Sequence, residues 1–223
     1  MTRERHVRFC ESAGVQFPRA THLVLGFEHE ADARRFLEAM RARLEAFALS
    51  LHPDKTRIIE FGRFAAANRA ARGLGKPETL DFLGFTFICG KSRRGKFLLH
   101  RKSRRDRMRA RLKELKDRLR LRMHRPLPET GKWLGQVVRG YLNYHAVPTN
   151  IRSVGGFREA VLRLWLRTLR RRGDRRKLSW DQFRKCAEPY LPKAQILHPW
   201  PEQRFAVTHP RREPDAGCER KLE

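Results

Sequence analysis

The apolar residues of this chain change their spacing at about Ser103, and this change constrains the fold more than any other feature. Before Ser103 they occur in short runs and alternations of strand length, and after it they recur every three or four residues. The first pattern favours β-strands and the second favours amphipathic helices. The sequence therefore predicts an α+β fold, with short antiparallel strands and one helix followed by an all-α helical part.

The first part begins with two strands around one helix. Residues 20–27 end in an apolar run that suits a buried strand, and residues 56–61 form a second short strand with a β-branched centre. Between them, acidic residues from Glu28 open a helix that is predicted to end near Ser50. Residues 62–79 are rich in Gly, Ala and Arg and are predicted to form a loop.

A hairpin is predicted before the change in spacing. Residues 80–88 alternate enough for a pair of strands, or for one strand with a bend at Gly84. Residues 90–95 begin and end with glycine and suit a turn, and residues 96–100 suit the return strand.

The helical part begins with a helix predicted over residues 103–123. Its apolar stripe consists of Met108, Leu112, Leu115, Leu119 and Met123. A second helix is predicted over 129–146 and a third over 157–172, with a turn at 150–156 between them. A fourth helix is predicted to begin at Ser179, a residue type that often caps helix N-termini.

The same spacing predicts which residues of the second and third helices face inward. They are Trp133, Val137, Tyr141 and Tyr144, and then Phe157, Val161, Leu164, Trp165 and Leu169. Residues 198–205 are predicted to be a rigid extended segment that packs Trp200 and Phe205 onto the helices. The polar tail, 208–223, is predicted to be disordered.

Positive charge is concentrated in the second part of the chain. From Lys91 onward, 37 Lys and Arg stand against 13 Asp and Glu, a net charge of +24, whereas residues 1–90 carry +3. Such an excess makes a compact state repel itself unless a polyanion is near. Since the basic residues interleave with a regular apolar stripe, the pattern favours a folded nucleic-acid-binding surface over a charged tail.

Several other classes of protein do not fit the sequence. A basic amphipathic helix can lie on an anionic membrane, but three successive amphipathic helices are expected to bury one another's stripes, so no membrane partner is predicted. The chain has no apolar run of transmembrane length and no apolar signal core at Met1, and it is predicted to be cytoplasmic. The four cysteines are scattered without a Cys-X-X-Cys pair, so a structural zinc site is not predicted. Five residues separate Gly84 from Gly90, whereas a nucleotide-binding loop has four residues between its two glycines. This segment is therefore not predicted to be a nucleotide-binding loop.

Five segments together resemble the C-terminal part of bacterial group II intron-encoded reverse transcriptase/maturases. They are Leu25-Gly-Phe-Glu-His-Glu-Ala-Asp-Ala-Arg-Arg-Phe-Leu37, Leu51-His-Pro-Asp-Lys-Thr-Arg-Ile-Ile-Glu-Phe-Gly62, Lys76-Pro-Glu-Thr-Leu-Asp-Phe-Leu-Gly-Phe85, Tyr141-Leu-Asn-Tyr-His-Ala-Val-Pro148 and His198-Pro-Trp-Pro-Glu-Gln-Arg-Phe205. The resemblance covers about residues 19–207. These proteins of mobile elements copy RNA into DNA and assist RNA splicing.

The resemblance implies a domain organisation. Residues 19–102 would be the C-terminal part of a reverse transcriptase palm, and 103–207 a helical thumb, the maturase-specific domain, which grips intron RNA. Residues 1–18 do not resemble the family and are expected to be unrelated or disordered. Only these residues precede the palm part, so the fingers and an earlier palm strand with a third catalytic aspartate are expected to be missing.

The resemblance also implies a lost polymerase site. In the family, the strand before Leu-Gly-Phe carries Tyr-Ala-Asp-Asp, and the two carboxylates of this motif hold catalytic Mg²⁺. Counting back from Gly26, Thr21 and His22 occupy the positions of the two aspartates. Neither is an anionic oxygen ligand of the kind that Mg²⁺ prefers, so no catalytic residue, metal site or cofactor is predicted here.

The predicted function is therefore binding of structured RNA, in particular group II intron RNA, with possible assistance to splicing. Two alternatives stay open: an RNA-directed DNA polymerase that is active only with a separately supplied N-terminal half, and a non-functional relic. Lys55 matches the family's palm lysine, although the turn around it is equally explained as a helix-to-strand connection. The predicted RNA-binding residues are Lys55, Arg104, Arg105, Arg109, Arg111, Lys113, Lys116, Arg120, Arg170, Arg171, Arg172, Arg175, Arg176 and Lys177.

Overall fold

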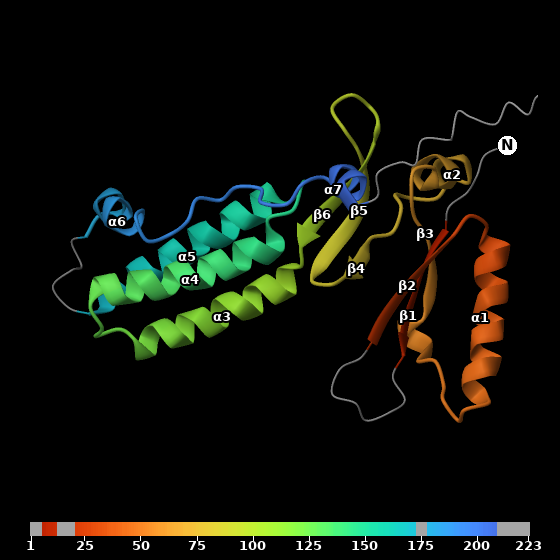
Figure 1. Ribbon diagram of the computed structural model, residues 1–223, viewed down its shortest axis with the longest axis horizontal. Coiled ribbons are helices and arrows are strands. Elements are labelled where there is room, and N and C mark those ends of the chain that lie inside the picture. Colours follow the sequence, from red (N-terminus) through yellow and green to blue (C-terminus); the bar gives the residue numbers. More distant parts are fainter. Residues whose placement is uncertain (1–5, 13–20, 173–177, 209–223) are drawn as a thin grey trace, which may run out of the picture. The chain divides into compact units, whose positions relative to one another are not determined.

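The computed structural model describes residues 6–12, 21–172 and 178–208, which form an α+β fold. The chain divides into two compact units, Met1–Arg107 and Met108–Glu223 (Figure 1). The first unit holds all the strands that the structure describes, and the second is helical. The α+β class predicted from the spacing of apolar residues is confirmed at this level.

A three-stranded antiparallel sheet opens the first unit. Its order is β2-β1-β3, with β1 at His6–Ser12, β2 at Thr21–Phe27 and β3 at Arg57–Glu60. The central strand β1 pairs along its length with β2 and from His6 to Phe9 with β3. This strand lies within the segment 1–18, for which the sequence favoured disorder or an unrelated origin. The structure gives it pairing partners on both sides.

Helix α1, at Glu30–Glu45, follows β2. Glu30 and Asp32 lie in its first turn, where negative charge interacts favourably with the helix dipole. Ala33 and Leu37 are its buried residues. The helix ends five residues before the predicted end at Ser50, and Ala48 has a φ of 55°, which a continuing right-handed helix does not allow.

A second helix stands where the sequence predicted only a loop. After the short 3₁₀-helix η1 at Pro53–Lys55 and strand β3, residues Ala65–Ala71 form α2. Five of these seven residues are alanine, the residue with the highest helix propensity, and Ala65 is buried. The loop prediction gave too much weight to the glycines, of which Gly73 only ends the helix with a φ of 67°.

A second antiparallel sheet completes the first unit. Its strands are β4 at Leu80–Phe82, β5 at Phe85–Lys91 and β6 at Phe97–Ser103, in sequence order. Leu83 and Gly84 both have positive φ and form the two-residue turn between β4 and β5. The structure thus selects the strand pair over the single bent strand. The predicted hairpin β5–β6 is confirmed and extends to Ser103.

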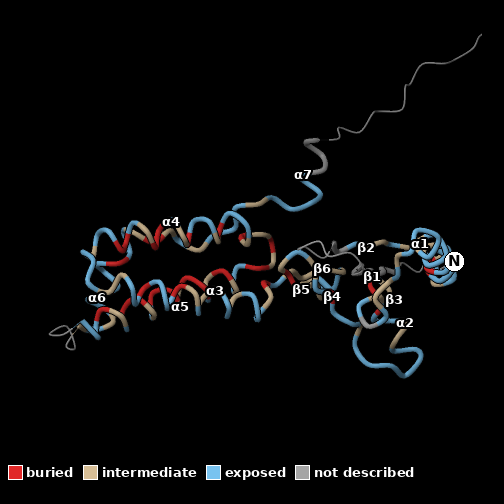
Figure 2. The backbone as a smooth tube through the Cα atoms, turned by 90° about the horizontal axis from the view of Figure 1, so that it is seen from below, coloured by how far each residue is buried: buried red, intermediate tan, exposed pale blue. Residues whose placement is uncertain are grey.

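The second unit is built on three long helices and one short one. They are α3 at Arg105–Leu121, α4 at Leu127–His145, α5 at Ile151–Arg171 and α6 at Trp180–Ala187. Buried residues face one another along their inner sides (Figure 2). On α3, Leu115 and Leu119 are buried and Met108 and Leu112 pack against the same core, which confirms the predicted stripe up to Leu119. Met123, also predicted in the stripe, lies beyond the end of the helix at Leu121.

The inward face of α4 differs from the prediction by one position. Leu134, Val138 and Leu142 are buried, whereas the predicted Trp133, Val137 and Tyr141 are half-buried at the edge of the core. Tyr144 is 52% exposed, so its inward assignment is wrong. The predicted residues Trp133, Val137 and Tyr141 resembled the true stripe because each directly precedes a buried residue.

Helix α5 begins six residues before its predicted start. The turn predicted at 150–156 is wrong, because residues from Ile151 are helical and Val154 is fully buried. Gly155 and Gly156 suggested a turn, but tertiary packing of the helix overrides their low propensity. The predicted inward residues of α5 are confirmed, with Leu164 half-buried.

The chain after α6 returns along the bundle. Buried Arg158 donates from Nε to the carbonyl of Pro192 at 2.9 Å, and the imidazole Nε2 of His198 lies 2.6 Å from the carbonyl oxygen of Asn143. Residues Pro201–Thr208 then form α7, where an extended segment was predicted. Trp200 is 43% exposed, so its predicted packing onto the helices is wrong.

Candidate nucleic-acid interface

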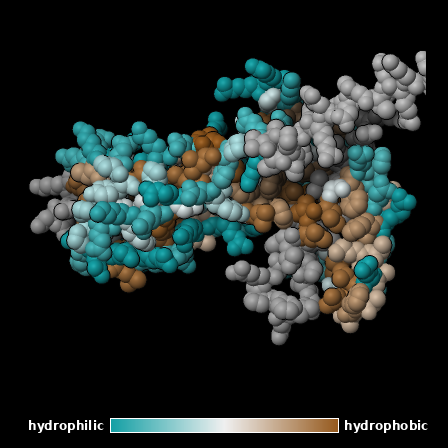
Figure 3. Space-filling model, viewed as in Figure 1, coloured by the Kyte–Doolittle hydropathy of each residue, from teal (hydrophilic) through white to brown (hydrophobic). Residues whose placement is uncertain are grey.

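The exposed basic residues of α3 follow its buried stripe. Arg109, Lys113, Lys116 and Arg120 each come one position after a stripe residue, so they form a row along one edge of the buried face. The core packing of the stripe fixes this row toward solvent. Figure 3 shows hydrophilic residues over much of the visible surface of this helical unit.

A second basic row lies on α5. Arg163 and Arg167 are one turn apart and exposed, and between them Trp165 and Leu166 are buried in the core. The burial of these two neighbours holds the α5 row at the surface. Neither arginine was predicted to bind RNA, although their spacing beside the apolar residues of α5 is visible in the sequence.

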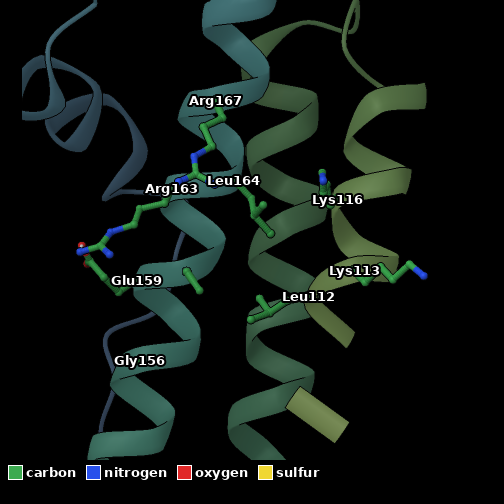
Figure 4. A pocket seen from close by; sticks show the side chains of 9 residues that line it. Leu112, Lys113, Lys116, Gly156, Glu159, Arg163, Leu164 and Arg167 are labelled. Atoms are coloured by element: carbon green, nitrogen blue, oxygen red, sulfur yellow. The ribbon is translucent and has the colours of Figure 1, made fainter. Parts of the chain in front are cut away.

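A groove of about 480 Å³ separates the two rows. Leu112 of α3 and Leu164 of α5 point into it from opposite sides, as Figure 4 shows. Lys113 and Lys116 lie along the α3 rim, and Arg163 and Arg167 along the α5 rim. The groove therefore has an apolar floor between two cationic rims.

Acidic side chains neutralise few of the rim cations. Glu159, also at the groove, approaches Arg163 at 3.5 Å. Among the residues that the structure describes, Lys113, Lys116 and Arg167 have no ion-pair partner, and the same holds for Arg109 on α3. The groove thus keeps an uncompensated positive charge, which suits a polyanion.

The acids of α3 are engaged away from the groove. Glu114 pairs with Arg111 and with Arg118, and Asp117 pairs with Arg120 at 3.6 Å. The hydrogen bond from Arg111 is the main reason that the pKa of Glu114 is lowered, so this carboxylate stays ionised. Arg111 and Arg120, both predicted to bind RNA, thus have partners on their own helix.

Three other predicted residues also hold the fold. The side chain of Arg104 is 28% exposed and donates to Asp106 at 2.7 Å. Arg170 donates to the carbonyl of Leu178 at 2.8 Å, and Arg172 donates to the carbonyl of Arg125 at 2.9 Å. Through these hydrogen bonds the three arginines stabilise the fold. The sequence pattern could not reveal these bonds.

The remaining predicted residues are spread over the chain. Arg105 and Arg171 are exposed at the start of α3 and the end of α5. Lys55 is exposed in η1, which belongs to the unit Met1–Arg107. Arg175, Arg176 and Lys177 lie outside the described residues.

Thr21 and His22 are the first two residues of β2, where they pair in register with Ser12 and Glu11 of β1. A neutral hydroxyl and an imidazole do not match the anionic oxygen ligands of Mg²⁺, and Glu11 is the single carboxylate in these pairs. Within the part of the chain that the structure describes, no group of three His, Cys, Asp or Glu could hold a metal ion. Its helices also include none long and apolar enough to cross a membrane.

No model of a known protein family matches this chain, and no curated protein sequence does so either. The resemblance to group II intron proteins therefore rests on the five segments quoted above. The groove between α3 and α5 is an independent, structural reason to consider a polyanionic partner.

Proposed function

We propose that this protein binds structured RNA through the groove between α3 and α5, as a derivative of the group II intron maturases that it resembles. The observation that carries the proposal is the groove itself, which is lined by Lys113 and Lys116 on the α3 side and by Arg163 and Arg167 on the α5 side of an apolar floor. In this proposal the unit Met108–Glu223 acts as the RNA-gripping thumb, and the unit Met1–Arg107 is the remnant of a palm. The natural ligand is group II intron RNA.

The rims and the floor suit different parts of an RNA. Lysine and arginine side chains neutralise phosphates, and the release of counterions makes such binding favourable at low salt. Structured RNA is recognised mostly by its shape, its phosphates and its 2′-hydroxyls. Leu112 and Leu164 offer no hydrogen-bonding group, so the floor can contact sugars but does not read base sequence.

Polymerase activity is not part of the proposed function. Thr21 and His22, at the positions that the resemblance assigns to the metal-binding aspartates, lack carboxylates. We expect no template-dependent DNA synthesis from the pure protein at saturating Mg²⁺. Primer extension on an RNA template measures this, and synthesis of product would overturn this part of the proposal.

The direct test of RNA binding is the double substitution Lys113→Gln and Lys116→Gln. Both side chains are exposed and have no ion-pair partner among the described residues, so the fold should not change. We expect the affinity for a folded group II intron RNA to fall about 10-fold, because two phosphate contacts are lost. Filter binding at low salt measures the dissociation constants.

A matched control removes the same charge elsewhere. Arg35 and Arg41 on α1 are exposed and pair with Asp32 and Glu38. The variant Arg35→Gln with Arg41→Gln lowers the net charge equally, and it should bind RNA as the unchanged protein does. Equal losses in both variants would show that only total charge matters and would refute the groove as the binding site.

A further inference from the structure

A second concavity lies at the C-terminal end of α3. It has a volume of about 470 Å³ and is lined by Arg118, Leu121, Arg122, Arg125 and Trp133. We call these five residues the arginine cup. Leu121 is 87% exposed and stands at its edge. Unlike the groove between α3 and α5, the arginine cup contains an aromatic ring.

The ring fixes the position of one guanidinium group. The guanidinium carbon of Arg122 lies 4.8 Å from the centroid of the Trp133 ring, a cation–π contact. Trp133 is half-buried and packs against the helical core, so the platform under Arg122 is rigid. The Arg122 side chain is still 39% exposed, which leaves a planar cation open to a second stacking partner.

Further cations surround this platform. Arg118 and Arg125 line the arginine cup, and Arg172 donates from Nη1 to the Arg125 carbonyl at 2.9 Å. Arg118 also pairs with Glu114 at 3.2 Å, and a second acid, Glu129, lies 3.9 Å from Arg122 and 3.5 Å from Arg125. Its side chain is 46% exposed and both distances are long, so the pairs are weak and a phosphate can displace them.

We infer that the arginine cup binds one unpaired nucleotide of an RNA, with the base stacked on the outer face of Arg122 and the adjoining phosphates on Arg118 and Arg125. This inference rests on the proposed function and adds an unpaired nucleotide to the RNA that the groove holds. Unstacked bases in loops and bulges are commonly held on aromatic rings or on guanidinium planes. A duplex does not offer a free base face, so the arginine cup would select RNA with a bulge or a loop.

The test compares three RNA hairpins that differ at one position. The first is fully paired, the second carries one bulged adenosine, and the third carries the same bulge without its base. We expect the bulged adenosine to bind about 5- to 10-fold more tightly than the baseless bulge, since stacking of one base contributes on that scale. Fluorescence anisotropy with labelled hairpins measures the three affinities.

Two variants connect this preference to the arginine cup. Arg122→Lys keeps the charge but removes the planar group, so the bulged and baseless hairpins should bind alike. Glu129→Gln removes the competing carboxylate and should raise the affinity for the bulged hairpin about 3-fold. Arg139→Lys is the matched control, because Arg139 is exposed on α4 and does not line the arginine cup; its preference should be unchanged.

The outcomes separate this inference from the proposed function. Tight binding of all three hairpins with equal affinity by the unchanged protein would refute the arginine cup and leave the groove standing. Failure to bind any hairpin or intron RNA would refute both. Persistence of the preference in Arg122→Lys would show that the base is held elsewhere. The comparison of the bulged and baseless hairpins with the unchanged protein shows whether the base contributes to binding, even if a variant fails to fold.

Discussion

Basic residues have two roles at the scale of single residues in the helical unit. Arg158 is only 8% exposed and donates to the carbonyls of Pro192 and Leu191, which holds the returning chain against α5. Lys113 and Lys116 are exposed and have no such partner. The sequence showed one continuous excess of basic residues and could not divide it, because the division depends on which carbonyls lie within reach after folding.

His145 gives the helical unit a dependence on pH. It is half-buried at the end of α4, where its ring stacks on Tyr141 at a centroid distance of 4.2 Å. Burial lowers the pKa of His145 below its usual 6.5, because the protonated form loses hydration. Just below pH 6.5 the unfolded chain binds more protons at this residue than the folded one, so stability falls as the pH drops below that value.

We predict that the melting temperature drops between pH 7 and pH 5, and that His145→Gln weakens this drop. Thermal unfolding followed by circular dichroism at several pH values measures it. His124→Gln is the control, because His124 is exposed just after α3 and the drop should persist. An unchanged pH dependence in His145→Gln would contradict the assignment of this titration to His145.

At the scale of elements, α4 packs closely because of its glycines. A Cβ atom built on Gly135 would lie 2.4 Å from the carbonyl oxygen of Tyr190, and one on Gly131 would lie 2.6 Å from the Tyr190 ring. Both glycines are buried, and Tyr190 follows α6. The close approach of this segment to α4 therefore requires residues without a side chain at both positions.

We predict opposite effects for two alanine substitutions on this one helix. Gly135→Ala should lower the free energy of unfolding by about 1–3 kcal/mol, because its methyl group forces a backbone segment away. Gly140→Ala should raise it by about 0.5–1 kcal/mol, since that position is open and alanine is the better helix former. Urea unfolding measures both, and a stabilising Gly135→Ala would contradict the packing described here.

Elements with a strong apolar period were predictable from the sequence, and those set by tertiary contacts were not. The stripe of α3 was identified correctly, and Ser179 caps α6 as expected, with its hydroxyl accepting from the amide of Gln182. In contrast, α2 and the first turns of α5 were predicted as loop and turn. In α2 the alanines favour a helix but the glycines near them were given more weight, and in α5 the packing of Val154 overrides the low helix propensity of Gly155 and Gly156.

At the scale of the whole molecule, the change of charge at Lys91 lies close to the boundary between the two units at Arg107 and Met108. The sequence predicted the α3 side of the candidate site, Lys113 and Lys116, from the basic residues beside the stripe. It missed Arg163 and Arg167 because nothing in a single sequence shows that α5 lies next to α3. The arginine cup was missed for the same reason, since Arg122 follows the end of α3 and Trp133 lies on α4.

The salt dependence of RNA binding tests the central claim most directly, namely that the groove between α3 and α5 binds RNA phosphates. The affinity of the unchanged protein for a folded RNA should fall steeply between about 50 and 200 mM salt. Replacement of Lys113, Lys116, Arg163 and Arg167 by glutamine should reduce the slope of log affinity against log salt by about 2.8 to 3.6, since each lost phosphate contact removes about 0.7 to 0.9. A slope that stays the same after these four substitutions would contradict the account.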